Sequence, residues 1–181
     1  MFDIADEGFA LTSARDGIDF DFFGSGTRRR ISWTAGGSHN AWLVFDMNRN
    51  GQIDSGIEMF GNSMPQPGKR AGRIGFTALA QFDSSQQGGN GDGIIDNRDA
   101  ISRYLLLWTD SNHNGVSEAN ELQTLAQAGV DSVSLNYSTS KQTDAFGNEL
   151  RYRSHFHTNR NGYGKNHWVY DVILLPKPAK H

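Results

Sequence analysis

The sequence contains no cysteine and only four prolines among its 181 residues. Without cysteine, the chain can form no disulfide, no thiolate nucleophile and no Cys-ligated zinc or iron–sulfur site. No apolar run approaches the length of about eighteen residues that a membrane-spanning helix requires. Residues 1–7 lack the basic start and apolar stretch of a signal peptide. Because the sequence is rich in phenylalanine, tyrosine and tryptophan, disorder is excluded, and we expect one folded domain over residues 1–181.

The acidic residues are concentrated in three segments, although the net charge of the chain is only −3. We name these segments loop I (residues 46–58), loop II (83–99) and loop III (110–121). They hold ten of the twenty acidic residues and only two basic ones, so they carry −8 while the rest of the chain carries +5. This separation of charge indicates that the loops bind a counter-ion.

Loop III matches the twelve-residue EF-hand calcium loop position by position. Acidic or amide side chains stand at positions 1, 3, 5, 9 and 12, a glycine permits the sharp turn at position 6, and a carbonyl points inward at position 7. Hard oxygen donors favour calcium over softer metals. The alternative is an Asx-rich surface turn without metal. The expected ligands are Asp110, Asn112, Asn114, Val116, Glu118 and Glu121.

Loop I keeps the same pattern, but its closing acid is one residue late. Ile57 stands at position 12 and Glu58 follows it. A one-residue widening around Gly56 would bring Glu58 round to the ion; the alternative is a degenerate loop that only turns the chain. The expected ligands are Asp46, Asn48, Asn50, Gln52, Asp54 and Glu58.

Loop II has a well-matched second half, but Gly88 stands where position 1 requires an aspartate. Asp83 lies five residues earlier, behind the insertion Ser-Ser-Gln-Gln-Gly-Gly. Either the insertion bulges out and Asp83 remains a ligand, or a carbonyl or water replaces it. The closing Asp99 is shorter than the usual glutamate, which suggests binding through one oxygen. The expected ligands are Asp83, Asn90, Asp92, Ile94, Asp96 and Asp99.

Hydrophobic spacing predicts short helices around the loops. Helical spacing occurs before loop II at residues 76–80, between loops II and III at 101–108, and after loop III at 122–126. The helix after loop I must be brief, because Gly61 and two prolines follow it closely.

Short aromatic or β-branched runs on both sides predict antiparallel strands. We therefore predict an α+β fold in which short helices bear EF-hand-like calcium loops, with a C-terminal β meander. Its parts are N-terminal strands in residues 1–45, the loop and helix region in 46–129, and the meander in 130–181. The predicted strands are 18–23, 29–33, 41–45, 133–137, 150–156 and 168–175, with loops at 139–148 and 157–166.

The sequence around loops I and III is similar to the calcium-dependent self-processing module of iron-regulated RTX (repeat-in-toxin) proteins. The shared features are Leu107-Trp108 before loop III, the late Glu58 with Phe60-Gly61, and the stretch from Gly129 to Tyr137. The resemblance covers residues 41–138 well and the first 40 residues loosely, and it does not extend beyond about residue 139.

This resemblance implies a module of a Gram-negative secreted protein that folds on binding calcium and cleaves an Asp-Pro bond just ahead of itself. The aspartate carboxylate would attack its own carbonyl, and water or a lysine amine would open the resulting anhydride. The four prolines of this chain follow Met64, Gln66, Leu175 and Lys177, so it contains no Asp-Pro bond. Either the scissile bond lay upstream, or the reaction has been lost. We therefore predict no catalytic residue.

Several other patterns are better explained by ordinary surface or core structure. His155, His157 and His167 form a possible zinc or copper site, but no further ligand has diagnostic spacing, and an exposed face of the meander is favoured. Arg28, Arg29 and Arg30 suit a solvated strand edge better than an anion site. Two degenerate loop patterns, starting at Asp3 and Asp21, are predicted to be turns. The aromatic residues Tyr152, Tyr163, Trp168 and Tyr170 suit either core packing or a sugar-stacking platform.

The sequence thus predicts a secreted calcium-binding module that folds on, or is stabilised by, two to four Ca²⁺ ions. We expect a monomer belonging to a larger protein exported by a type I-like system, with no nucleic-acid partner. The alternative is a calcium-dependent autoproteolytic module whose Asp-Pro site lies upstream. A third hypothesis is an adhesin or glycan-binding module that uses the aromatic meander.

Overall fold

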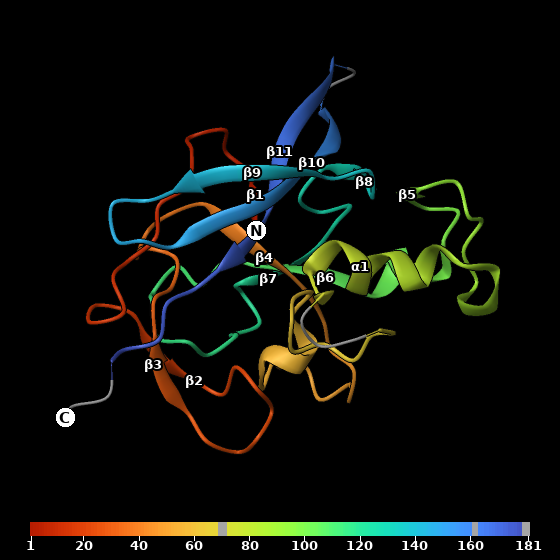
Figure 1. Cartoon of the computed structure of the whole chain (residues 1–181). Helices are drawn as coiled ribbons and strands as arrows, with labels where there is room; N and C mark the ends of the chain where they lie inside the picture. Colours follow the sequence, from red (N-terminus) through yellow and green to blue (C-terminus); the bar gives the residue numbers. More distant parts are fainter. Residues whose placement is uncertain (69–71, 161–162, 179–181) are drawn as a thin grey trace.

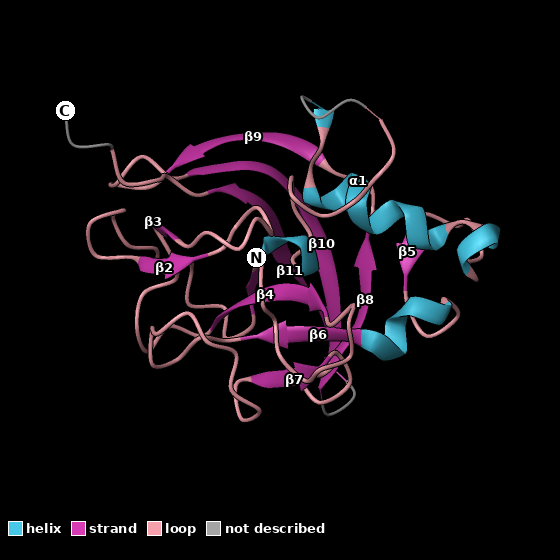
Figure 2. Cartoon of the chain, turned by 90° about the horizontal axis from the view of Figure 1, so that it is seen from below, coloured by secondary structure: helices cyan, strands magenta, loops and turns pink. Residues whose placement is uncertain are grey.

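The computed structural model describes residues 1–68, 72–160 and 163–178, and it is mostly β structure (Figures 1 and 2). One α-helix, α1 (Gly75–Ala80), is present in these ranges and continues directly into the 3₁₀ turn η3 (Gln81–Asp83). The remaining 3₁₀ turns are η1 (Gly56–Glu58), η4 (Ser85–Gln87) and η5 (Ala100–Tyr104). The strands are β1 (Phe2–Asp3), β2 (Ile18–Phe20), β3 (Arg29–Ile31), β4 (Asn40–Phe45), β5 (Ile94–Ile95), β6 (Leu105–Trp108), β7 (Leu122–Thr124), β8 (Val130–Ser134), β9 (Ser138–Thr143), β10 (Glu149–Arg160) and β11 (Tyr163–Ile173).

A nine-stranded antiparallel sheet forms the body of the molecule. Its strand order is β5-β8-β10-β11-β1-β4-β6-β7, and β9 pairs with β10 beside this path. The sheet curls, as Figure 2 shows, and β2 and β3 form a separate two-stranded ribbon. The large sheet contains strands from each of the three predicted segments, 1–45, 46–129 and 130–181, so all three share its hydrogen-bonded ladder.

Two hydrophobic clusters fill the interior. One packs helix α1, through Phe76 and Leu79, against Val133 and Phe156 of the sheet. The other lies beneath the β2–β3 ribbon and is built on tryptophan rings, with Trp33 5.4 Å from Trp108 between ring centroids. Loop III begins two residues after the buried Trp108, so this aromatic core fixes the strand end that leads into the loop.

The predicted α+β fold is wrong. Residues 101–108 form η5 and strand β6 instead of an amphipathic helix, and residues 122–126 form strand β7 and the start of a turn. Strand β6 pairs with β4 on one side and β7 on the other, so it lies inside the sheet. Its continuous apolar sequence Leu105–Trp108 therefore reflects a strand buried within the fold, which periodicity alone cannot distinguish from a buried helix.

The loops consequently do not lie between pairs of helices as in an EF-hand. Loop I leads from β4 into η1, loop II leads from η3 into η5, and loop III connects the hairpin β6–β7. The helix predicted before loop II is confirmed as α1. The brief helix predicted after loop I is not found in residues 59–68, and the 3₁₀ turn η1 lies within the loop itself.

The flanking strands agree with the prediction in kind. Strands β2, β3, β4, β8, β10 and β11 overlap the predicted runs, although β2, β3, β8 and β11 end before the runs do, and β10 lies between β8 and β11. The predicted loop at 139–148 is partly wrong, because strand β9 occupies 138–143. Similarly, β10 and β11 extend into the loop predicted at 157–166, since their long antiparallel ladder continues to the pair Arg160–Tyr163.

Candidate metal-binding loops

Loops I, II and III share one backbone conformation, numbered here by EF-hand position. In loop I, Arg49 at position 4 and Gly51 at position 6 have φ of 61° and 83°; in loop III, His113 and Gly115 have 60° and 69°. In loop II the same two positions are glycines, Gly91 and Gly93, with φ of 74° and 81°. Left-handed backbone is uncommon outside glycine. Its recurrence at the same two positions shows that the three loops are versions of one structure.

The aspartate at position 1 holds the turn by accepting two backbone hydrogen bonds. In loop III the carboxylate of Asp110 accepts from the N–H groups of Asn114 (3.0 Å) and Gly115 (2.9 Å). In loop I the carboxylate of Asp46 accepts from Asn50 (3.2 Å) and Gly51 (2.8 Å). In both loops the two donors lie four and five residues after the aspartate. Hydrogen bonds from the loop backbone therefore hold the first acid in place without a metal ion.

In loop II, Asp83 takes the place of the missing position-1 aspartate. Its carboxylate accepts hydrogen bonds from the N–H groups of Gly91 (3.0 Å) and Gly93 (2.9 Å). The insertion is folded out as η4, and Gly89 passes so close to Asp83 that a Cβ there would lie 2.2 Å from its carbonyl carbon. Of the two alternatives left by the sequence, the structure favours the bulged insertion, with Asp83 in the loop.

The closing acids fold back over their loops and are buried. Glu121 accepts from the N–H of Ser111 (2.9 Å) and, at 3.4 Å, from the indole N–H of Trp108. The late Glu58 accepts from the N–H groups of Met47 (3.1 Å) and Asp54 (2.8 Å), so the one-residue widening does bring its carboxylate back to loop I. In loop II, Asp99 accepts from Asn90 and Asp96 at 3.3 and 2.9 Å.

Buried carboxylates in these loops lack a basic partner. The exposed fractions are 1% for Asp110, 4% for Glu121, 2% for Glu58, 2% for Asp99 and 8% for Asp83. Within the described residues, no Lys, Arg or His nitrogen lies within 4.0 Å of any of these five carboxylates. Removing a carboxylate from water without a counter-charge is unfavourable by several kcal/mol, by rough estimate. These five carboxylates are therefore held by backbone N–H donors, with no basic side chain of the described residues beside them.

The middle positions are exposed and hydrogen-bonded to one another. In loop III the amide of Asn114 donates to Glu118 at 2.7 Å, and this bond is the main reason that the pKa of Glu118 lies below its ordinary value. In loop I the amides of Asn48 and Asn50 donate to Asp54 at 2.9 and 2.8 Å. The position-7 residues Gln52, Ile94 and Val116 are exposed. Ile94 and Val116 have apolar side chains, so only their backbone carbonyls are candidates for ligands.

Loop II differs from the others because an arginine of the loop pairs with the loop's own acids. The guanidinium of Arg98 lies 2.6 Å from both Asp92 and Asp96, the acids at positions 5 and 9. Its hydrogen bond to Asp96 holds the pKa of that carboxyl below its ordinary value. Asn90 also donates to Asp92, at 3.0 Å. The acids in the middle of loop II are thus partly neutralised by an arginine of the same loop.

The donor chemistry of the loops fits a hard divalent cation. Carboxylate, amide and carbonyl oxygens are the ligands that calcium takes in such loops. In the part of the chain that is described, however, no three histidine or acidic side chains lie close enough together to hold a metal ion by themselves. A calcium ion would therefore need the asparagine and carbonyl oxygens as well as the first and last acids of each loop.

Loops I and III are joined through their eighth positions. The buried N–H of Ile53 donates to the hydroxyl of Ser117 at 2.7 Å, and both residues stand seven places after the first aspartate of their loop. Sequence reasoning missed this contact. The sequence does carry a signal for it: position 8 is an apolar residue, Ile53, in loop I and a residue with a hydroxyl, Ser117, in loop III.

The two degenerate patterns adopt the same turn. Asp3 accepts from Glu7 (3.0 Å) and Gly8 (2.7 Å), as the intact loops do, and Asp21 accepts from Ser25 and Gly26 at 3.0 and 2.6 Å. These turns agree with the prediction. Nearby acids of the first turn have basic partners, because Glu7 lies 2.9 Å from His39 and Asp6 pairs with Lys165.

The remaining candidate groups do not converge on a site. Trp168 is 40% exposed, whereas Tyr170 is buried and Tyr152 is half-buried against the core, so they present no common stacking face. The side chain of Tyr163 lies outside the described residues, and Arg30 pairs with Asp19 at the surface. The three histidines have separate partners: His155 packs against Trp168 with tilted rings (4.0 Å between centroids), His157 lies 3.4 Å from Asp131, and His167 bonds Thr158 at 3.0 Å.

Comparison with known proteins places the whole architecture in a family. The SPM domain family matches residues 1–175. The chain is an SPM domain. It is also 37% identical over 147 residues to the iron-regulated protein FrpA of Neisseria meningitidis serogroup C, a match that covers 81% of this chain and 12% of FrpA. This SPM domain therefore corresponds to about one eighth of its relative, and the resemblance to iron-regulated RTX proteins is confirmed at the level of the family.

No helix of this SPM domain, within the described residues, has the length and apolar character needed to span a membrane.

Proposed function

We propose that this SPM domain is a calcium-binding module of a larger secreted protein, and that two to four Ca²⁺ ions complete its fold. The observation that carries this proposal is the set of buried loop carboxylates without a basic partner in the described chain. Calcium supplies the missing charge, and its oxygen preference matches the donors that surround these carboxylates. Secretion of the larger protein is supported by the calcium loops rich in asparagine, which suit the higher calcium level outside cells, and by the resemblance to iron-regulated RTX proteins.

Calcium binding and folding are coupled in this proposal, since the position-1 and closing acids are brought together only by the loop backbone. A ligand that binds only the folded state at 100 times its dissociation constant adds about 2.7 kcal/mol of stability. Thermal unfolding followed by circular dichroism, in excess calcium and in excess chelator, measures the stabilisation by calcium. Calorimetric titration gives the number of bound ions. Equal unfolding temperatures in the two solutions would refute the proposal.

A matched pair of variants tests where the calcium binds. Glu121→Gln removes the closing carboxylate charge of loop III and should eliminate one equivalent of bound calcium, or weaken it by at least about tenfold. Glu149→Gln makes the same chemical change on an exposed residue of β10 outside the loops and should leave the titration unchanged. Equal titrations for the two variants would show that loop III is not a calcium site.

A second candidate function is self-processing, which membership of the SPM family favours. In this scheme the carboxylate of an upstream aspartate attacks its own carbonyl carbon, and the bond to the following proline breaks as the proline nitrogen takes up a proton. Water then opens the cyclic anhydride to a free aspartate, or a lysine amine opens it to form an amide. The loops would act by holding the module folded, and no residue of this chain is assigned to the reaction.

The test is a chain that carries an Asp-Pro dipeptide a few residues before Met1. On addition of calcium, mass spectrometry should show a cut at that bond, and Asp→Asn at the dipeptide should stop it. An intact chain over a wide range of calcium concentrations would exclude self-processing while leaving calcium binding to be judged by its own experiment.

A further inference from the structure

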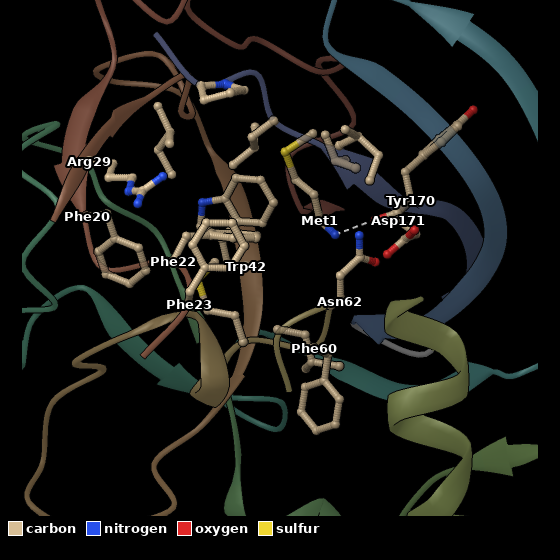
Figure 3. Close-up of a pocket in the computed structure, with 18 residues that line it drawn as sticks. Met1, Phe20, Phe22, Phe23, Arg29, Trp42, Phe60, Asn62, Tyr170 and Asp171 are labelled. Carbon is tan, nitrogen blue, oxygen red and sulfur yellow. Dashed lines mark hydrogen bonds between the residues drawn. The ribbon is translucent and has the colours of Figure 1, made fainter. Parts of the chain in front are cut away.

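An apolar cavity of about 310 Å³ opens beside Met1, and none of the described residues that line it belongs to loops I, II or III (Figure 3). Aromatic side chains, including Phe22 and Trp42, line one side, and the end of β11 from Tyr170 onward lines the other. The volume lies at the lower end of the range of ligand sites, roughly 300–1,000 Å³. It therefore suits a short segment of polypeptide.

The cavity continues the line of strand β1. β1 has two residues and lies between the much longer β11 and β4. Its ladder with β11 extends to Met1, whose amine donates to the carbonyl of Tyr170 at 2.6 Å and whose carbonyl accepts from the N–H of Tyr170 at 2.9 Å. Beyond Met1, β11 runs on to Ile173 without β1 beside it.

The free edge of β11 points into this space. Backbone groups alternate in direction along a strand, so the N–H and C=O of Val172 face the same side as those of Tyr170. No bond from Val172 to a segment on that side is found in the described chain. On the opposite wall, Phe60 donates to the carbonyl of Leu43 (3.2 Å) and so occupies the edge of β4. One strand position, beside β11 alone, is left open.

Two buried hydrogen-bond donors, the Met1 amine and the Trp42 indole, indicate that the open strand position beside β11 suits an uncharged peptide segment. Burial lowers the pKa of the Met1 amine to about 5, whereas a peptide N–H would make the same bond to Tyr170 without the loss of hydration of a charge. The indole N–H of Trp42, in the same wall, is buried with no acceptor among the described residues. Asp171 is already engaged by Gly75 (2.8 Å) and Arg151 (3.2 Å).

We propose that this cavity binds the extended segment directly ahead of residue 1, which continues β1 antiparallel along β11. The register pairs Phe2 with Val169, so the second residue ahead of Met1 would exchange both backbone hydrogen bonds with Val172. Side chains alternate along a strand, so that residue shares the face of Met1, which packs in the tryptophan-based cluster, and an apolar side chain fits there. The inference rests on the proposed function, in which the module stands behind other residues of a larger protein.

The test compares the chain with one extended before Met1 by Thr-Val-Thr-Val-Thr, which puts valine opposite Val172. Amide exchange of Val172 should slow by at least about tenfold on extension, as expected for a newly formed ladder bond. The amide of Ile173 faces β10 and should change little, because it is bonded in both chains. Replacing the valine opposite Val172 by proline, which has no N–H and suits no paired strand position, should restore fast exchange.

Unchanged exchange at Val172 in the extended chain would overturn the inference. Protection that rises with protein concentration would also overturn it, because it would mean that a second copy fills the cavity. Repeating the measurement in calcium and in chelator separates the two proposals. If the Val172 amide is protected but calcium does not stabilise the domain, only the calcium-binding proposal is refuted. If calcium stabilises the domain but the Val172 amide is not protected, only the docking of the segment is refuted.

Discussion

The carboxylate of Asp83 accepts a hydrogen bond at 2.9 Å from the N–H of Gly93, ten residues further along the chain. The corresponding bond in loop III, from Gly115 to Asp110, spans five residues. Loop II thus keeps the first acid of the common turn although an insertion separates that acid from the rest of the pattern. The insertion changes the spacing in sequence but keeps the bond from position 6. The second donor to Asp83 is Gly91 at position 4, in place of the position-5 donor of loops I and III.

Asp83→Asn should destabilise the domain. The amide can present only one oxygen to the two N–H groups that the carboxylate now accepts, and an unsatisfied buried donor costs about 1–3 kcal/mol. Asp131→Asn changes an exposed residue of β8 and should alter stability by less than about 0.5 kcal/mol. Urea unfolding in chelator measures both. Similar midpoints for the two variants would show that Asp83 does not hold loop II.

Arg98→Gln should strengthen calcium binding at loop II. The guanidinium lies against Asp92 and Asp96, so it competes with a cation for the same oxygens, and its removal should raise the affinity of one site by about tenfold. Without calcium, loss of these exposed ion pairs should cost no more than about 1 kcal/mol. Arg103→Gln, close by in η5 and without an ion pair among the described residues, is the control. Calorimetric titration measures the calcium affinity of each variant. An affinity at loop II that is unchanged or lower in Arg98→Gln contradicts the prediction.

Ser117→Ala should uncouple loops I and III. The hydroxyl of Ser117 is the acceptor for the buried N–H of Ile53, and its loss leaves that donor unsatisfied, at about 1–3 kcal/mol. Because each loop would then order separately, calcium binding should become less cooperative. The neighbouring Ser111→Ala removes a partly exposed hydroxyl from within loop III and should weaken that loop while cooperativity persists. Titration curves with the same steepness for wild type and Ser117→Ala would disprove the coupling.

Stability should fall as the pH drops from 8 to 5. The Met1 amine has an ordinary pKa of 8.0, and burial lowers it to about 5 in the folded chain. Between these values the unfolded state binds the proton and the folded state does not, so acidification favours unfolding, by a few kcal/mol in order of magnitude. N-terminal acetylation removes this titration. Urea unfolding of the free and acetylated chains should therefore converge near pH 8 and above and diverge toward pH 5; parallel pH profiles would contradict the assignment.

The loops could be found from the sequence because their conformation is local. An aspartate that accepts from the backbone four and five residues later, together with a glycine at position 6, leaves a fixed spacing in Asp46–Gly51 and Asp110–Gly115. Even the late Glu58 was predicted to reach its loop, since one extra residue changes the path of the chain only slightly. That these loops bind calcium remains a prediction.

The sheet could not be found in the same way. Leu105–Trp108 has spacing that fits a helix, and only the pairing of this segment with Trp42–Phe45 and Leu122–Thr124 makes it a strand. Trp42–Phe45 lies about 60 residues away along the chain, and Leu122–Thr124 lies in a segment whose hydrophobic spacing also fits a helix. A prediction based on nearby residues gives no weight to hydrogen bonds made across such distances.

The sequence by itself determined the three acidic loops and the register of their glycines, because each depends on residues within one short segment. It also indicated the family, through several such segments together. Only the tertiary structure decided that strands carry the loops, that Ile53 bonds Ser117, and that β11 has an open edge beside Met1. These features arise when distant segments pack into one sheet. Their free energy comes from contacts between those segments, which local spacing does not encode.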